Sequence, residues 1–349
     1  MNIINHPSSL TSPSRPKKES GKSPFARWLL LLALVFAPQV VHAQWQATVG
    51  AQNHDKGHQA LAFLPNEIWI HVGEDITWHF DVDEIHTVTF LRANQPRPFF
   101  PDGCPGFSTS PATFNGSTCV TTPPLVRGST FTVRFPTAGN FKLTCLIHEN
   151  MSGAIHVLAS NLPLPHDQAF YDRAADDRRR ELLAEADGRT GDAPKVAEAT
   201  DNRHEHDNGK VSAGTGEVLA TGGGSDSVSV VRFQNDPTEI RAGQTVEWTN
   251  VDPTLPHTIT FGAEPPGNPV PPSPNVTVDA DGARHAVIAS LTDSAHSGFI
   301  VAAPQERLGL PQAPLGTTRF RVTFPHAGRY PYICVLHDNL GMKGTVIVH

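Results

Sequence analysis

Cysteine and long apolar runs are scarce in this sequence of 349 residues, which contains four cysteines and 38% hydrophobic residues. Segments with helical periodicity are also few, whereas 31 prolines and 28 glycines indicate a loop-rich protein of short strands. A Ser/His/Asp arrangement and a glycine-rich phosphate loop are both missing. The sequence therefore gives no support to the enzyme classes that depend on them.

A surplus of basic residues is missing as well. The chain has 27 Lys and Arg against 34 Asp and Glu, which gives a formal net charge of −7 at pH 7. Such a balance argues against nucleic-acid binding and favours basic partners. The length is sufficient for two domains, each with its own hydrophobic core.

The first 43 residues are typical of an export signal. A basic segment ends at Arg27, an apolar run covers residues 28–37, and Val41-His42-Ala43 offers a small-residue cleavage site before Gln44. The apolar run is short for a membrane span, although an uncleaved anchor is an alternative. No Arg pair precedes the run, which favours the general secretory route. We expect a periplasmic or secreted protein.

Two loops near the ends of the two halves of the sequence share one pattern. Each has a Cys-x-x-His pair followed by Met, between an alternating segment and a short apolar run. The residues of the two loops are Cys145, His148 and Met151, and Cys334, His337 and Met342. A pattern that occurs twice in the same order is hard to attribute to accident.

A second histidine precedes each loop in the chain. His86 and His257 both begin a His-Thr-β-branched-Thr-Phe segment, which predicts a loop that delivers His to the start of a strand. Each half thus offers His, Cys, His and Met. A thiolate, two imidazoles and a weak thioether form the ligand set of a blue-copper electron-transfer site. Because the cysteine must be deprotonated, copper binding should weaken as the pH falls.

The remaining cysteines, Cys104 and Cys119, form the obvious disulfide if the other two bind metal, in keeping with an oxidising compartment. A loop of about 15 residues closed in this way is stabilised by roughly 3 kcal/mol. The alternative pairing, Cys145 with Cys334, would remove the thiol from both patterns.

Alternating apolar residues and frequent turn signals predict an all-β protein with a β-sandwich built twice. Residues 240–248 repeat the pattern of residues 70–78, which ends in Trp. The expected organisation is a signal peptide at residues 1–43, a first domain at 44–158, a connector at 159–225 with a helix near 167–186, and a second domain at 226–349. The helix is densely charged, so we interpret it as a solvated spacer and keep a binding helix as the alternative. Residues 189–225 are polar and Gly-rich, which predicts flexibility.

These residues resemble the cupredoxin family, the plastocyanin- and amicyanin-like type 1 blue-copper proteins. The shared pieces are the Gly-acid-hydrophobic-x-Trp strand, the upstream His and the closing Cys-x-x-His loop. The spacing from Cys145 to Met151 is similar to amicyanin, and that from Cys334 to Met342 is similar to plastocyanin. The resemblance covers both expected domains but not the connector.

The resemblance implies two tandem Greek-key sandwiches with one type 1 copper ion each. Its metal ligands carry over onto His86, Cys145, His148 and Met151 and onto His257, Cys334, His337 and Met342. It also implies single-electron transfer with redox partners such as a c-type cytochrome or an oxidase. In this family the loop His faces solvent through an apolar patch, which here predicts exposed rings at His148 and His337. The neighbouring patch residues would be Leu146, Ile147, Leu336 and Leu340.

Three other functions are compatible with parts of the pattern. Two-domain cupredoxins include copper nitrite reductases and small laccases, but those enzymes need a His next to the Cys. Here Thr144 and Leu146 flank Cys145, while Ile333 and Val335 flank Cys334. A zinc site would more naturally use a second Cys or a carboxylate than Met. A copper carrier or storage protein would use the same ligands without passing electrons.

Overall fold

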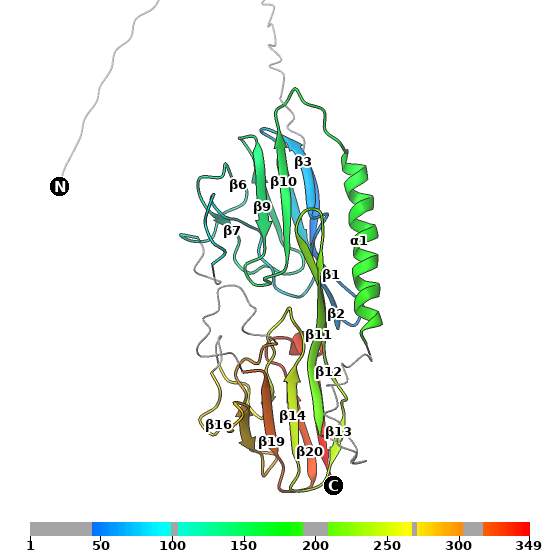
Figure 1. Ribbon diagram of the computed structural model, residues 1–349, viewed down its shortest axis with the longest axis vertical. Helices are drawn as coiled ribbons and strands as arrows, with labels where there is room; N and C mark the ends of the chain where they lie inside the picture. The colour runs from blue at the N-terminus through cyan, green and yellow to red at the C-terminus, as the bar shows by residue number, and fades with distance from the viewer. Residues whose placement is uncertain (1–43, 99–103, 191–208, 267–270, 303–316) are drawn as a thin grey trace, which may run out of the picture. The chain divides into compact units, whose positions relative to one another are not determined.

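Among the residues that the structure describes, strands are the main secondary structure, and one long α-helix accompanies them (Figure 1). The structure is a computed structural model that describes residues 44–98, 104–190, 209–266, 271–302 and 317–349. The expected export signal lies outside these residues. In the part of the chain that the structure describes, no helix is both long and apolar enough to cross a membrane.

The strands of the N-terminal half, β1 to β10, form two layers. One layer has the strand order β2-β1-β4-β8-β6, and in the other β10 lies between β3 and β9, with β5 and β7 following β9. The bounds are β1 Gln44–Gln52, β2 His58–Leu64, β3 Glu67–His71, β4 Asp75–Phe80, β5 Thr89–Phe90, β6 Ala112–Thr113, β7 Val120–Thr121, β8 Thr130–Arg134, β9 Gly139–Thr144 and β10 Ser152–Leu158.

The strands of the C-terminal half, β11 to β21, repeat this arrangement. One layer has the order β16-β17-β19-β14-β11-β12, and the other is a separate sheet with the order β13-β21-β20-β15-β18. The bounds are β11 Lys210–Ala220, β12 Ser225–Gln234, β13 Thr238–Ile240, β14 Thr245–Asn250, β15 Thr260–Phe261, β16 Thr277–Val278, β17 Arg284–Val287, β18 Ala295–His296, β19 Arg319–Thr323, β20 Gly328–Ile333 and β21 Lys343–Val348. A 3-10 helix, η2 Asp338–Leu340, follows β20.

The alternating apolar residues of the sequence fill the interior between the layers. In β4, for example, Ile76, Trp78 and Phe80 are fully buried. Trp248 in β14 is buried in the same way and packs edge-on against Phe261. Side chains of a strand alternate between the two faces of a sheet, so each half buries one face of every layer. This arrangement confirms the all-β sandwich fold expected from the sequence.

Strand β12 belongs to both halves. It pairs with β11 on one side and, antiparallel, with β2 of the N-terminal half, where Ser227 lies opposite Leu61 and Val230 opposite His58. The layer that contains β1 and β2 and the layer that contains β11 and β12 are therefore one continuous sheet. Backbone hydrogen bonds hold the two halves in a fixed register, independently of the connector.

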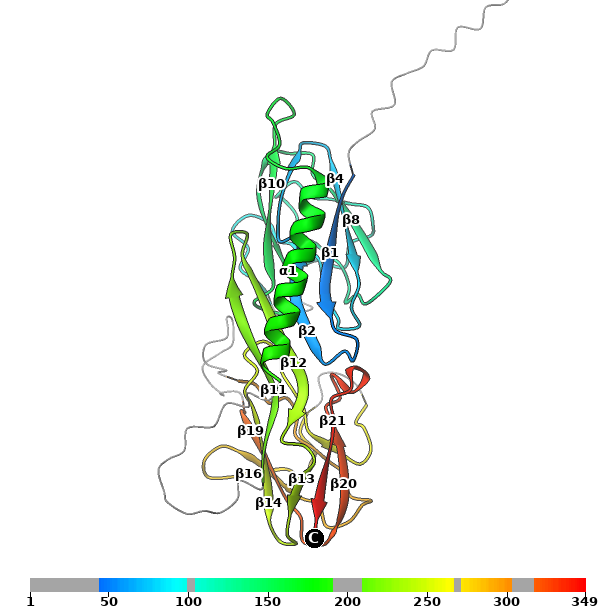
Figure 2. The same ribbon diagram turned by 90° about the vertical axis from the view of Figure 1, so that its right-hand side faces the viewer.

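The helix α1, Gln168–Gly188, packs against this continuous sheet (Figure 2). The carboxylate of Asp167 caps its first turn by accepting a hydrogen bond from the backbone N–H of Phe170, at 2.8 Å. Its buried residues are Tyr171, Ala175, Leu182 and Ala186. The last three pack with alanines and valines of β2 and β12. The interpretation as a solvated spacer was thus wrong, because an apolar stripe of small residues was too weak a signal among so many charges.

Part of the segment expected to be flexible is also structured. Residues 210–220 form β11, whose Thr215 and Ser212 are buried, and the sheet register places Val211 opposite Trp248. This strand pairs with β12 on one side and β14 on the other, and it packs through small side chains. A polar, Gly-rich composition is therefore compatible with an ordered strand. The expectation of flexibility for residues 191–208 lies outside the described residues.

A disulfide joins Cys104 and Cys119, whose Cα atoms are 5.4 Å apart. Cys145 and Cys334 are free and buried. The pairing expected from the sequence is therefore confirmed.

Candidate metal centres

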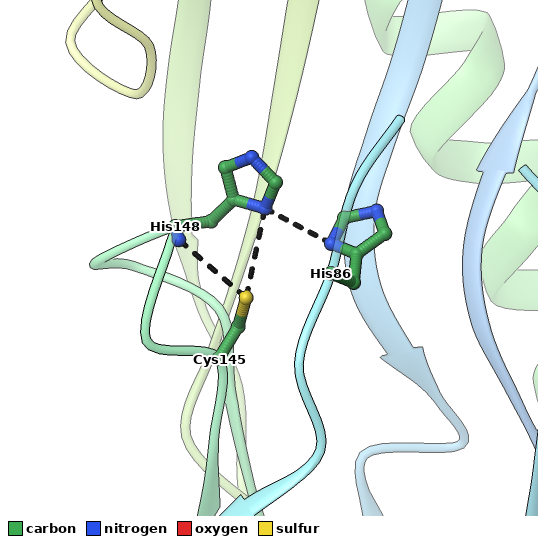
Figure 3. A group of neighbouring side chains, drawn as sticks. All are labelled: His86, Cys145 and His148. Carbon is green, nitrogen blue, oxygen red and sulfur yellow. Dashed lines mark hydrogen bonds between the residues drawn. The ribbon is translucent and has the colours of Figure 1, made fainter. Parts of the chain in front are cut away.

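The first cluster consists of His86, Cys145 and His148 (Figure 3). Cys145 and His148 stand in the loop between β9 and β10, and His86 comes from the loop before β5, where it bridges to Leu125. The two Nδ1 atoms are 2.9 Å apart, and Cys145 Sγ lies 3.7 Å from His148 Nδ1. All three side chains are essentially inaccessible to solvent.

The second cluster consists of His257, Cys334 and His337. Its loop lies between β20 and β21, and His257 bridges to Ile300 before β15. The Nδ1 atoms of His257 and His337 are 3.2 Å apart, and Cys334 Sγ is 3.9 Å and 3.5 Å from them, respectively. The structure thus brings together six of the eight residues that the sequence predicted as ligands, in two equivalent places.

The predicted axial residues, Met151 and Met342, are fully buried. Each closes its loop through the backbone, because its carbonyl oxygen accepts the N–H of the cluster cysteine at 3.0 Å. Both methionines therefore belong to the same loops as the thiolates. Their role as weak ligands stays a prediction.

A threonine supports the sulfur in each cluster. The backbone N–H of Thr87 points at Cys145 Sγ (3.4 Å), and that of Thr258 points at Cys334 Sγ (3.3 Å). The two threonine hydroxyls accept the N–H of the residue after each cysteine, at 2.8 and 2.9 Å. An N–H donor stabilises a thiolate and holds it in place before any ion binds. The sequence showed Thr after both histidines, yet this role was missed.

The loop histidines do not face solvent. His148 is 1% exposed and His337 is 3% exposed, and the expected patch residues Leu146 and Leu340 are also buried. The prediction of solvent-facing rings was wrong, because the edge of each loop is covered by the other half of the chain. The remote nitrogens of these rings face protein groups instead.

The remote Nε2 atoms meet different groups in the two clusters. The carboxylate of Asp252 lies 3.4 Å from His257 Nε2 and is fully buried. His86 Nε2 and His148 Nε2 are also buried, and neither has a hydrogen-bond partner among the described residues. Both loop rings face the same acid, since Glu84 oxygens lie 3.4 Å from His148 Nε2 and 3.7 Å from His337 Nε2.

Charge differs between the clusters in a second respect. The guanidinium of Arg97 donates hydrogen bonds to the carbonyl oxygens of Cys145 (3.0 Å) and Leu146 (2.7 Å). The first cluster therefore has a cation directly beside its cysteine, whereas the second cluster has the Asp252 carboxylate beside its upstream histidine. Neither residue was identified from the sequence, because only the fold brings them to the clusters.

A glycine makes room for each upstream histidine. Gly50 in β1 and Gly214 in β11 have φ angles of +70° and +72°, and the register of each strand shifts at that residue. A Cβ at Gly50 would lie 2.9 Å from His86 Nε2, and one at Gly214 would overlap the His257 ring. A glycine inside a strand pattern is a signal for such a bulge. That signal was present at both positions and was not used.

Without metal, each cluster holds a thiolate beside an imidazolium. Burial lowers the pKa of His148, but the Cys145 thiolate outweighs it and raises that pKa to about 9. Burial likewise opposes the rise at His257, whose pKa Asp252 and Cys334 bring to about 9. Burial would raise the thiol pKa values, yet the adjacent rings hold those of Cys145 and Cys334 well below their usual value.

These shifts predict the pH dependence of stability in the metal-free chain. Because folding raises the pKa of the His from 6.5 to about 9, the His stabilises the folded chain fully below pH 6.5, and this stabilisation is lost as the pH rises through about 9. Because folding lowers the pKa of the Cys below 9.0, the Cys stabilises the folded chain fully above pH 9.0, and this stabilisation is lost as the pH falls. The two slopes cancel between these limits. Below pH 6.5 the cysteine slope remains, and His86, whose pKa is lowered by burial, adds a slope of the same sign. We expect a melting temperature that is constant between about pH 6.5 and 9 and falls in more acidic buffer.

The measurement is a series of thermal melts after copper removal. A chain with both Cys145→Ala and Cys334→Ala is the control, and its melting temperature should depend much less on pH between 6.5 and 4.5. A metal-free chain that is most stable near pH 5 would contradict the paired thiolates.

Comparisons with known proteins agree with this geometry for part of the chain. A family model described as copper binding proteins, plastocyanin/azurin family, matches residues 220–349. The match contains the whole second cluster and covers less than half of the chain. No curated protein matches the sequence.

Solved structures of cupredoxins are similar to portions of the chain. A purple cupredoxin from Nitrosopumilus maritimus is 22% identical over 33% of this chain and 99% of its own, with a TM-score of 0.23. A reduced amicyanin variant is 16% identical over 33% and 83%, with a TM-score of 0.23. Oxidised plastocyanin from Dryopteris crassirhizoma is 21% identical over 40% and 99%, with a TM-score of 0.20.

Proposed function

We propose that this chain is an exported blue-copper protein that binds one type 1 copper ion in each half and carries single electrons between redox partners. The observation that carries the proposal is the repeated cluster. Two imidazole Nδ1 atoms and one thiolate converge in a buried place, twice, with the same supporting N–H from Thr87 or Thr258.

The donor atoms fit copper in number, kind and spacing. Metal–nitrogen bonds of about 2.0 Å and metal–sulfur bonds of about 2.3 Å place donors around one ion roughly 3–4 Å apart. The Nδ1–Nδ1 separations of 2.9 and 3.2 Å and the sulfur–Nδ1 separations of 3.5–3.9 Å lie close to that range. A soft thiolate with two imidazoles and a buried methionine nearby suits Cu(I) and Cu(II) alike.

The surroundings of each cluster favour electron transfer. When bound, copper supplies a one-electron couple, and the protein must hold the ligands nearly still while the charge changes. Here the two cysteines and the two methionines belong to the hydrophobic core, and the backbone N–H of each cysteine is bonded to the methionine carbonyl at 3.0 Å. Such a frame is rigid before the ion binds, which keeps the reorganisation on electron transfer small.

Partners and compartment follow from charge and cysteine chemistry. The net charge of −7 favours a redox partner with a basic surface, such as a c-type cytochrome, or a terminal oxidase. The basic and apolar N-terminal segment and the Cys104–Cys119 disulfide support export to the periplasm or beyond.

The first experiment is a copper count with visible and EPR spectra of the mature chain. We expect two copper ions per chain, intense blue or green absorption from the thiolates and two narrow copper hyperfine patterns. A third copper with an ordinary type 2 signal would favour an oxidase or nitrite-reductase-like enzyme instead. Two coppers that no one-electron donor can reduce would indicate storage or transport of copper. A colourless protein that holds zinc would refute the proposal.

A further inference from the structure

Glu84 stands between the two clusters. It belongs to the loop between β4 and β5, two residues before His86, and its side chain is 6% exposed. One carboxylate oxygen lies 3.4 Å from His148 Nε2, and the other lies 3.7 Å from His337 Nε2. One acid from the N-terminal half therefore faces the loop histidines of both clusters.

Such sharing is unusual for a carboxylate beside metal-binding histidines. A His that binds metal through one nitrogen donates its other ring N–H to a carboxylate, a carbonyl or water, and each ring normally has its own acceptor. His257 follows that rule with Asp252. Burying a carboxylate costs free energy unless nearby groups compensate its charge. For an acid buried between two imidazole rings, both rings contribute to that compensation.

We propose that Glu84 links the two clusters into one internal electron relay, which runs from His337 across the Glu84 carboxylate to His148. This inference rests on the proposed function, because it assumes that both clusters hold copper. The two rings and the carboxylate provide a short connection through contacts of 3.4 and 3.7 Å. In the cupredoxin family, by contrast, the loop histidine would face solvent.

The packing of the two halves holds this connection in place. The hydroxyl of Ser227 in β12 donates to the carbonyl of Asn150 in the first loop, at 3.1 Å. The guanidinium of Arg232, also in β12, donates to the carbonyl oxygens of Leu340 in the second loop (2.8 Å) and Asp55 in the β1–β2 turn (2.7 Å). One strand thus fastens both ligand loops, and the β2–β12 pairing fixes that strand.

The charges beside the clusters give the relay a direction. The Arg97 guanidinium lies 3.0 Å from the Cys145 carbonyl oxygen, closer than to its own counter-ion Glu149 at 3.9 Å, and a cation at this place disfavours the more positive, oxidised state of the first site. Asp252 places an anion on His257, which favours the oxidised state of the second site. The first site should therefore have the higher potential. If both sites held copper, an electron delivered to the second site by a one-electron donor would pass to the first site. The second site would return to Cu(II) and the first would become Cu(I), with no proton moved and no bond formed.

The test compares Glu84→Gln with Glu67→Gln in the full copper-loaded chain. Glu67 pairs with His156 at 3.0 Å in the same half and touches neither cluster, so it controls for the loss of a His–Glu pair. We expect Glu84→Gln to raise the potentials of both sites, by a tenfold or larger change in each redox equilibrium, about 59 mV for one electron. A role confined to the structure of one loop would shift one potential only, and that result would overturn the relay.

Rapid photochemical reduction by less than one electron per chain measures the relay itself. The visible bands of the two sites are assigned from Cys145→Ala and Cys334→Ala, and the latter chain should show the higher potential. After the flash, the electron should redistribute towards the first site within one chain, at least about tenfold more slowly in Glu84→Gln than in Glu67→Gln. Equal rates, or a higher potential at the second site, would contradict the proposal.

One measurement needs no substitution. In the unmutated Cu(I) chain, the Nε2 protons of His148 and His337 should exchange slowly with water in ¹H–¹⁵N NMR spectra, and fast exchange of both would refute the contact with Glu84. Absence of blue copper from the unmutated chain would instead overturn the proposed function. Two blue sites whose potentials and exchange rate ignore Glu84→Gln would overturn the relay alone.

Discussion

If each half binds one copper ion, as proposed, replacing Cys334 with alanine should remove one ion and one thiolate absorption band and leave the other site intact. The thiolate is the strongest ligand of each cluster, and a methyl group cannot replace it. The remaining histidines, His257 and His337, would bind copper far more weakly and without the intense colour. The copper content should fall from two to one per chain, measured by elemental analysis beside the visible spectrum.

The reciprocal substitution, Cys145→Ala, is the matched control. It should remove the band of the first cluster and spare the second, because no thiolate is shared between the clusters. The double variant should be colourless. If either single substitution removed both bands, the chain would hold one shared site, and the assignment of one copper ion to each half would be wrong.

Replacing Gly214 with alanine should abolish copper binding at the second cluster and destabilise the fold. The residue has a φ of +72°, where an L side chain costs about 1–2 kcal/mol, and its Cβ would overlap the His257 ring. The ring cannot withdraw freely, since its far nitrogen faces the buried Asp252. We expect the band of the second cluster to be lost while that of the first remains, measured by spectroscopy and thermal melts.

Gly243→Ala separates the two causes. Gly243 has a φ of +87°, yet a Cβ there would meet no atom within 4 Å. It should share the backbone cost and retain both copper ions. Equal copper loss in the two variants would show that general destabilisation, and not displacement of His257, explains the effect.

The ligands could be read from the sequence because they are encoded locally. Cys145 and His148 stand three residues apart in one loop, and the fold needs only a strand on each side to bring them together. The upstream histidine was harder to identify, because His86 is 59 residues away from the cysteine in the chain. The Thr-rich segment that follows it occurs again after His257, and this repetition identified it. The all-β sandwich was equally accessible, because strand alternation records which face of a strand is buried.

The groups that surround the clusters could not be read in this way. Glu84, Arg97 and Asp252 are ordinary charged residues in loops, and no spacing rule connects them with a histidine on another strand. The contacts of Arg97 and Asp252 are made within one half, but the contact of Glu84 with His337 depends on how the two halves meet. That in turn depends on the pairing of β2 with β12, two segments more than 160 residues apart in the chain.

The wrong prediction of exposed loop histidines has the same origin. In a single sandwich the end of the ligand loop is exposed to solvent. The resemblance to the cupredoxin family therefore led to the expectation of a solvent-facing histidine. Here the second half covers the first loop and the first half covers the second. The rings of His148 and His337 therefore meet Glu84 where a lone sandwich would have water.

The strand shared by the two halves limits how the protein can be divided. A fragment that ended before β11 would keep β2 as an open edge, where the N–H and C=O groups that face β12 between His58 and Leu61 would have no partner. The valines of β12 that pack beneath α1 would be missing as well, which leaves Leu182 and Ala186 partly uncovered. An unpaired edge beside an apolar patch is a template for association with other chains. The two halves resemble repeats in sequence, but separating them would expose a strand edge and apolar side chains that their pairing covers.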